Sequence, residues 1–208
     1  SVYLNQLRTT TDQKLRVGDY VRIHRRPRRF PVESVDWSSR IIFENEKILV
    51  LHKPSGIPCH PTVDNQIENV LNRMKQENQC EYYITHRLDV ATQGLLILAK
   101  DKSTQRELNL AFQQRKITKI YHALCQNTSL PFAIYEHHMV KSPRAPKTVM
   151  DQPAPDTDQC LLEIKNLVVQ SEPLSAPALF YEIELMTGRT HQVRAQLSAL
   201  KAPISGDI

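Results

Sequence analysis

The chain has 208 residues, and 40% of them are hydrophobic. This composition excludes a wholly disordered chain, and no apolar run reaches the roughly 20 residues of a membrane-spanning helix, so we expect no membrane partner. The formal net charge of +5 only slightly favours a polyanionic partner, although five of the 27 Lys and Arg residues lie between Arg22 and Arg29. That basic segment is either a solvated loop or a surface for phosphate contact.

The cysteines and the ends of the chain add three expectations. Cys59, Cys80, Cys125 and Cys160 are far apart and form no C-x-x-C pair. We therefore expect buried thiols in a reducing, cytoplasmic compartment, with no zinc and no other metal. The chain begins without Met and ends at Pro-Ile-Ser-Gly-Asp-Ile, so we expect an internal fragment that is truncated at its C-terminus.

The first half of the chain contains alternating and helical patterns separated by turn residues. Leu15 to Ile23 predicts a hairpin around a Gly-Asp turn, and the Glu44-Asn45-Glu46 turn separates two strands, Ile41–Phe43 and Ile48–Leu51. Pro54, Gly56, Pro58 and Pro61 define a loop. Three further elements follow: a helix from Asp64, its N-cap, to Glu77; a buried strand, Gly94–Ala99; and a helix capped by Ser103, with Leu108, Ala111 and Phe112 on one face.

The second half is richer in strands. The predicted strands are Lys116–Gln126, Cys160–Gln170 and Ala178–Thr187, and a helix from Thr190, its N-cap, to Leu200 follows. His137 to Gln159 is rich in Pro, Asp and Lys, which predicts a long surface excursion. The strands do not alternate strictly with helices. We therefore predict an α+β fold with a mixed, mostly antiparallel sheet flanked by helices.

Three groups of residues could carry chemistry. Asp89 lies in a turn before the apolar strand; it is either the partner of Arg87 in a structural ion pair or an ionised nucleophile or base. Met186 to Leu197 is either an anion-binding corner or an ordinary capped helix. Tyr121 either packs in a strand or contacts a base. Phosphate-loop, H-E-x-x-H and G-x-S-x-G patterns are absent from the sequence.

Five motifs in order resemble the RluA-type RNA pseudouridine synthases. They are K-P-S-G-I-P-C-H from Lys53, H-R-L-D from His86 with Thr92 and Gly94, K-I-Y-H-A from Lys119, T-G-R-T-H-Q-V-R from Thr187, and P-I-S-G-D from Pro203. Leu15 to Ile23 also resembles the tail of an S4-type RNA-binding domain. The resemblance implies that residues 1–30 are a partial S4-like module and linker, and that residues 31–208 are the catalytic domain.

The resemblance also implies an activity: isomerisation of a uridine in structured RNA (rRNA or tRNA) to pseudouridine, by a monomer without a cofactor. The catalytic residues would be Asp89, as nucleophile or sugar-proton base, Tyr121 at the target base, and Arg194 paired with the carboxylate. Extrusion of the base would involve Arg87. The other expected RNA contacts are Lys53, His60, His86, Thr92, Lys119, Arg189 and His191.

Two departures from the family pattern affect substrate contacts rather than chemistry. Gln93 stands where Ser is frequent, and Lys147 to Gln159 replaces a family segment. A non-catalytic RNA-binding protein on the same fold is the main alternative, although such a protein would be expected to lack Asp89 or Arg194. A glycosidase is less favoured, because it needs two opposed carboxylates and only Asp89 stands out.

Overall fold

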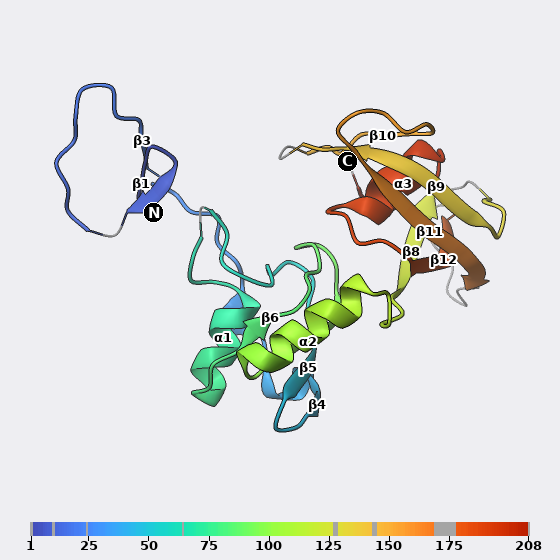
Figure 1. The fold of residues 1–208 in the computed structure, drawn as a ribbon. Coiled ribbons are helices and arrows are strands. Elements are labelled where there is room, and N and C mark those ends of the chain that lie inside the picture. Colours follow the sequence, from blue (N-terminus) through green and yellow to red (C-terminus); the bar gives the residue numbers. More distant parts are fainter. Residues whose placement is uncertain are drawn as a thin grey trace. The chain divides into compact units, whose positions relative to one another are not determined.

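A computed structural model describes residues 2–9, 11–23, 25–63, 65–126, 129–142, 145–168 and 178–207. The chain divides into two compact units, Ser1–Leu110 and Ala111–Ile208. Figure 1 shows the elements of each unit along the chain. The domain boundary predicted near residue 30 lies inside the first unit and stays a prediction.

The first unit begins with a small antiparallel sheet in the order β2-β1-β3, formed by β1 (Val2–Leu4), β2 (Leu7–Thr9) and β3 (Val21–Ile23). Its register places Tyr3 between Arg8 and Arg22 on one face. The other face carries Val2, Leu4, Leu7, Thr9, Val21 and Ile23, of which Leu7 is 76% exposed. On the first face, the Tyr3 hydroxyl donates to the Val63 carbonyl at 2.8 Å.

The predicted hairpin over Leu15–Ile23 is wrong in its first arm. β3 pairs with β1 instead, and the turn at Gly18 only leads into it. Asn5 makes this possible, because its backbone N–H donates to the Tyr20 carbonyl and its side-chain oxygen accepts from the Tyr20 N–H, both at 2.9 Å. Its side-chain amide also donates to Asp19 at 2.8 Å. The predicted hairpin was local, whereas the real partner strand lies at the start of the chain.

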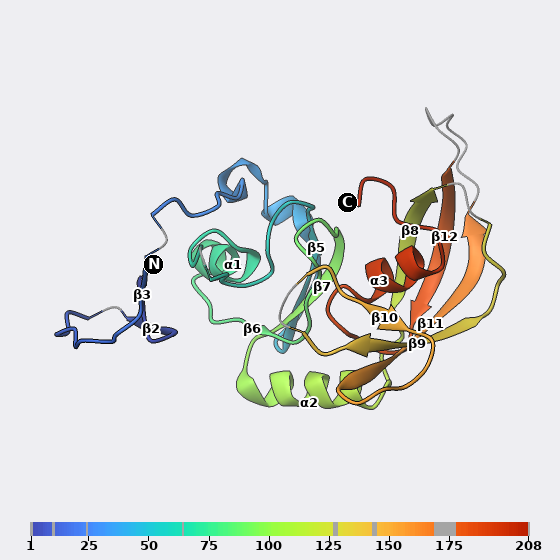
Figure 2. The same cartoon turned by 90° about the horizontal axis from the view of Figure 1, so that it is seen from above.

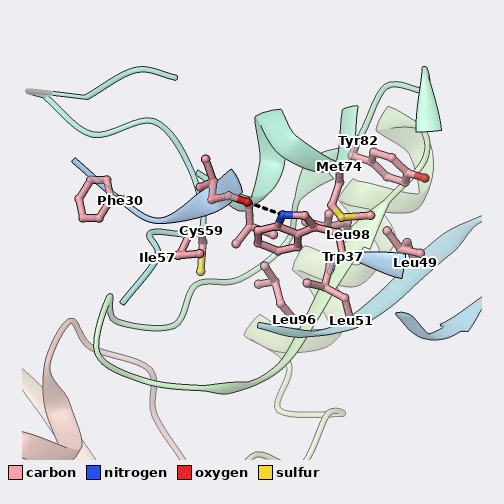
Figure 3. Close-up of a cluster of buried hydrophobic side chains, with 12 residues drawn as sticks. Phe30, Trp37, Leu49, Leu51, Ile57, Cys59, Met74, Tyr82, Leu96 and Leu98 are labelled. Atoms are coloured by element: carbon pink, nitrogen blue, oxygen red, sulfur yellow. Dashed lines mark hydrogen bonds between the residues drawn. The ribbon is translucent and has the colours of Figure 1, made fainter. Parts of the chain in front are cut away.

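A second antiparallel sheet, in the order β4-β5-β7-β6, supports the core of this unit. Its strands are β4 (Ile41–Glu44), β5 (Ile48–Lys53), β6 (Tyr83–Ile84) and β7 (Gly94–Ala99). The predicted turn is confirmed, since the Asn45 side chain accepts from the N–H groups of Lys47 and Ile48. The core contains Trp37, which is 2% exposed and donates to the Val32 carbonyl at 2.8 Å (Figure 3).

Two short 3-10 helices, η1 (Val32–Ser34) and η2 (Ser38–Arg40), lie on either side of Trp37 in the sequence. Helix α1 covers Val70–Asn78 and buries Val70 and Met74 in the same core. Its predicted start at Asp64 is wrong: the N-cap is Asn69, which accepts from the Asn72 N–H, and Asp64 itself lies outside the described residues. Before the helix, Asn65 accepts from the N–H groups of Ile67 and Glu68, which forms a side-chain turn in place of a helical one.

Helix α2 (Lys102–Gln113) begins one residue before the predicted Ser103 cap. Asp101 is the cap, because its carboxylate accepts from the backbone and the hydroxyl of Thr104. The three residues predicted on its inner face, Leu108, Ala111 and Phe112, are partly buried.

The second unit is a five-stranded antiparallel sheet in the order β10-β9-β11-β12-β8. The strands are β8 (Ile120–Gln126), β9 (Ile134–Val140), β10 (Val149–Met150), β11 (Thr157–Val168) and β12 (Ala178–Leu185). Helix α3 (Gln192–Ala199) lies against this sheet, with Leu197 buried against Tyr181 and Ile183 (Figure 2).

The surface excursion predicted from His137 to Gln159 is wrong at both ends and in its middle. β9 and β11 pair along this segment, β10 joins the edge, and His137 is only 5% exposed. The α+β class is confirmed, and every pairing among the described strands is antiparallel. Cys59, Cys125 and Cys160 are buried free thiols, as predicted, and Cys80 is partly exposed.

Candidate catalytic site

Asp89 lies in the turn between β6 and β7, in the first unit. Its carbonyl accepts from the Thr92 N–H at 3.0 Å, and its side chain is half-buried. Gly94 starts β7 at a φ of +134°, which L side chains rarely adopt. Two residues further on, Leu96 is fully buried. The turn therefore joins Asp89 directly to a strand that the core holds in place.

A buried lysine braces this turn from the neighbouring loop. Lys53, at the end of β5, has no exposed surface, and its ammonium donates to the carbonyls of Ile57 at 2.7 Å, Pro54 at 2.9 Å and Val90 at 3.3 Å. Burial lowers the pKa of Lys53, and the negative charge of Asp89 acts against that shift. All three N–H donors are engaged. This geometry does not fit the RNA contact predicted for Lys53, and it gives the residue a structural role instead.

The same loop holds the turn through its backbone and small side chains. The Gly56 N–H donates to the Val90 carbonyl at 2.8 Å, and the Ser55 hydroxyl donates to the Ala91 carbonyl at 2.7 Å. Gly56 has a φ of +85°, so a side chain at this position would strain the loop. The residues from 54 to 57 therefore fix the backbone on the C-terminal side of Asp89.

Cys59 fixes the backbone on the other side of Asp89. Its sulfur accepts from the Leu88 N–H and donates to the Leu88 carbonyl, both at 3.3 Å. Burial raises the pKa of the Cys59 thiol, which keeps it protonated and able to donate. The sequence predicted only a buried thiol, and neither residue spacing nor motif signalled this contact. Leu88 and Val90, the neighbours of Asp89, are thus both tied to one loop.

His86 is braced against β7. Its Nε2 accepts from the Ile97 N–H at 3.1 Å, and the Thr85 hydroxyl donates to the Ile97 carbonyl at 2.7 Å. These bonds attach the start of the His-Arg-Leu-Asp motif to the strand. The RNA contact predicted for His86 stays a prediction, as does the one for the partly exposed Thr92.

Arg87, next in the motif, is exposed and points its guanidinium to the loop before α1. Its Nη1 lies 3.1 Å from Nε2 of His60, whose other ring nitrogen lies 2.8 Å from the Pro61 carbonyl. An ion pair between Arg87 and Asp89 was one of the two readings of the sequence. The Arg87 side chain contacts His60 instead, so the structure brings together two predicted RNA contacts.

In the second unit, Tyr121 lies on β8 with its ring partly buried against the core of the sheet. Lys119 precedes the strand and donates to the Thr187 carbonyl at 3.0 Å. Burial lowers the pKa of Lys119, and the charge of Arg115 lowers it further. A Cβ at Gly188 would lie 3.2 Å from the Lys119 ammonium. Lys119 therefore supports the Thr-Gly-Arg turn at close range.

Two buried glutamines, Gln192 and Gln196, organise that turn, and neither was predicted as a site residue. The Gln192 side-chain oxygen accepts from the Thr187 hydroxyl at 2.8 Å and from the Arg189 N–H at 2.9 Å. The Gln192 amide donates to Gln196 at 2.9 Å, and the Gln196 amide lies 3.0 Å from Nδ1 of His137. The signal that could have found them is their i, i+4 spacing on the inner face of α3.

The predicted N-cap of α3 at Thr190 is wrong. The helix begins at Gln192, and the residue before it, His191, has a left-handed φ of 58° and makes no side-chain cap. Gln192 itself satisfies the Arg189 N–H, which replaces the predicted cap. Arg189 is exposed, and its Nη2 lies 3.8 Å from the Asp158 carboxylate.

Arg194 forms a bidentate ion pair with Asp207. Its Nε lies 2.6 Å from one carboxylate oxygen, and its Nη2 contacts the other. Such a pair fixes the plane of the guanidinium as well as its position. Asp207 belongs to the last of the five motifs, and no role was predicted for it. The predicted partnership of Arg194 with Asp89 stays a prediction, because the two residues belong to different units.

A family model described as "RNA pseudouridylate synthase" matches residues 47–199. The chain belongs to this family. It is 29% identical over 218 residues to RNA pseudouridine synthase 6, chloroplastic, of Arabidopsis thaliana, a match that covers 96% of this chain and 46% of the relative. The corresponding rice protein is 30% identical over 220 residues, with the same coverage of both chains. The chain thus spans about half the length of these two curated relatives.

Solved structures agree on the fold of a pseudouridylate synthase. Human RNA pseudouridylate synthase domain containing 4 superimposes with a TM-score of 0.65 at 21% identity, covering 82% of this chain and 68% of that one. The residues that brace Asp89 and the Gln192 network lie inside the matched range. Among the described residues, no group of three or more metal-binding side chains occurs, and no helix is long and apolar enough to cross a membrane.

Proposed function

We propose that this protein isomerises specific uridines to pseudouridine in structured RNA, either rRNA or tRNA. The observation that carries the proposal is the family match over residues 47–199, with Asp89 of its His-Arg-Leu-Asp motif held on both sides by one loop. The names of two relatives mention tRNA: tRNA pseudouridine(31) synthase of Saccharomyces cerevisiae and tRNA pseudouridine synthase C of Yersinia pestis.

The proposed chemistry consumes no oxidant, reductant or group donor, because the product is an isomer of the substrate, and we propose that it uses no cofactor. The bond between C1′ and N1 breaks, the uracil turns, and C5 bonds to C1′; C5 loses a proton and N1 gains one. Asp89 acts as nucleophile at C1′ or as base toward a sugar proton. Tyr121 contacts the turned base and assists removal of the C5 proton.

The target base must leave the RNA stack before its C1′ can be reached. We propose that Arg87 contacts the RNA where the base is extruded, since its side chain is exposed. A carboxylate that is enclosed between protein and RNA stays ionised only when a cation is near, because burial favours the neutral acid. Arg194 is the proposed cation, and its bidentate pair with Asp207 would hold its guanidinium in a fixed plane.

RNA contacts outside the centre are also proposed. His60, His86, Thr92, Lys119, Arg189 and His191 keep the RNA-binding role predicted from the motifs. Residues 1–30 are proposed to be a partial S4-like module whose basic segment meets phosphates. Arg25 and Arg26 are exposed in that segment, and Arg22 lies 4.6 Å over the Tyr3 ring.

We also propose that the protein is a monomer and that it is located in the cytoplasm. The Arabidopsis and rice relatives carry the word chloroplastic in their names, which makes the compartment a separate question from the chemistry. Sedimentation of the purified protein and fractionation of cells that express it would test these two points.

The deciding experiment incubates the purified protein with tRNA and rRNA from cells that lack it, and maps pseudouridine chemically. Asp89→Asn should abolish the product while RNA binding persists. Asp36→Asn is the matched control, because Asp36 is exposed and its oxygen accepts from Ser38, which an amide oxygen can also do. Full activity of Asp89→Asn would refute the catalytic assignment. RNA binding without any product from the unaltered protein would favour a non-catalytic RNA-binding protein.

A further inference from the structure

We propose that His60 is a positioning residue for Arg87, acting as a neutral hydrogen-bond acceptor that holds the guanidinium ready for RNA. The inference rests on the proposed function. It assigns to the His60 imidazole one tautomer, with the proton on Nδ1, and one role, which is to hold the Arg87 guanidinium. It starts from the 3.1 Å contact between Nη1 of Arg87 and Nε2 of His60.

The neighbours of His60 determine its protonation. A guanidinium can only donate hydrogen bonds, so Nε2 must carry a lone pair in this contact. The other ring nitrogen, Nδ1, lies 2.8 Å from the Pro61 carbonyl, which can only accept. Nδ1 therefore carries the proton. Only the neutral imidazole with its proton on Nδ1 makes both contacts. Every other form of the ring loses at least one of them.

The surroundings of the Arg87–His60 pair indicate what this contact does. Among the described residues, His60 is the only hydrogen-bond partner of the Arg87 side chain, which is otherwise exposed. An exposed arginine samples many rotamers, and fixing one costs conformational entropy when RNA binds. His60 restricts that freedom beforehand. Because the neighbouring Cys59 holds Leu88, the loop fixes the arginine side chain and the backbone beside Asp89 together.

A double-mutant cycle separates this role from a structural one. His60→Leu removes the acceptor, and His60→Gln keeps an oxygen near the place of Nε2. Both are made in the unaltered protein and in the Arg87→Ala variant. With RNA that the unaltered protein modifies, His60→Leu should lower kcat/KM by ~5- to 10-fold, mainly through KM, which is within the range for one ordinary hydrogen bond and suits a partly exposed one. His60→Gln should restore most of the loss.

In the Arg87→Ala background, His60→Leu should have no further effect, since its target is gone. An equal loss in both backgrounds would overturn the proposal, because His60 would then act through the loop alone. A loss with His60→Gln as large as with His60→Leu would overturn it too.

A spectroscopic readout is independent of catalysis. In protein with ¹⁵N-labelled histidine, the signal that disappears in His60→Gln belongs to His60, and its couplings report which nitrogen carries the proton. We expect the proton on Nδ1, and a proton on Nε2 would refute the inference. If no RNA is modified but the proton is found on Nδ1, the proposed function fails while the hydrogen-bond geometry stands. The double-mutant cycle is then measured with RNA affinities from fluorescence anisotropy in place of kcat/KM.

Discussion

Lys53→Met tests the claim that one buried ammonium holds the loop beside Asp89. Methionine has a similar length and volume, so it should leave no large cavity. The Val90 carbonyl keeps its bond from the Gly56 N–H, but the carbonyls of Pro54 and Ile57 lose the lysine donor. A buried acceptor left without a partner costs about 1–3 kcal/mol. Removing the buried charge offsets part of this destabilisation. We therefore expect the free energy of unfolding to fall by about 2–4 kcal/mol.

Trp37 offers a direct assay, because it is the one tryptophan of the chain and lies in the core next to this loop. Its fluorescence during urea unfolding reports the free energy of unfolding of the first unit. Lys47→Met is the control, since Lys47 is exposed, and it should change that free energy by less than about 0.5 kcal/mol. If Lys53→Met unfolds at the same urea concentration as Lys47→Met, the reasoning about the buried ammonium is wrong.

Three further changes test other contacts. The Arg29 guanidinium and the Phe30 N–H lower the pKa of Glu68 from 4.5 to about 2, so its stabilisation is present above about pH 4.5 and is lost as the pH falls toward 2. Glu68→Gln should therefore destabilise the chain at neutral pH, and the difference in urea midpoint should shrink between these values; a difference independent of pH would contradict this. Gln196→Leu should lower the free energy of unfolding by about 1–3 kcal/mol, because Nδ1 of the buried His137 loses its amide donor and the Gln192 amide keeps only the Leu161 carbonyl as acceptor; an unchanged urea midpoint would argue against the network. Asp207→Asn should reduce kcat by roughly tenfold or more through a misplaced Arg194, given about 1.5–3 kcal/mol for a charged hydrogen bond; single-turnover rates would measure it, and an unchanged rate would exclude this role.

Strands that carry their pattern locally were predictable. The turn at Asn45 and the strands beside it were predicted from alternation and turn residues, and the structure confirms both. The start of α1 was not, because Asn65 uses its own side chain to cap the two N–H groups that a helix from Asp64 would have engaged. Helical spacing does not reveal such a competing turn.

Long-range contacts explain what was missed in the site. The motifs selected Asp89 and Arg194, but nothing local links Cys59 to Leu88 or Arg194 to Asp207, which are 29 and 13 residues apart. Strand β9 was missed because its second half falls in the segment rich in Pro, Asp and Lys that resembled a loop. Strand β11 was predicted from Cys160 onward, and only its first residues, 157–159, were assigned to that loop.

Asn5 decides which side of the small N-terminal sheet is basic. A slip of β3 by one residue would move Arg22 onto the apolar face and bring Val21 or Ile23 beside Tyr3. Three hydrogen bonds that join Asn5 to Asp19 and Tyr20 oppose that slip and act as a pin on the register of β3. Because the pin lies at the very base of β3, insertions or deletions between residues 11 and 16 should leave the sheet in register, whereas the distance from Asp19 to Arg22 must stay fixed.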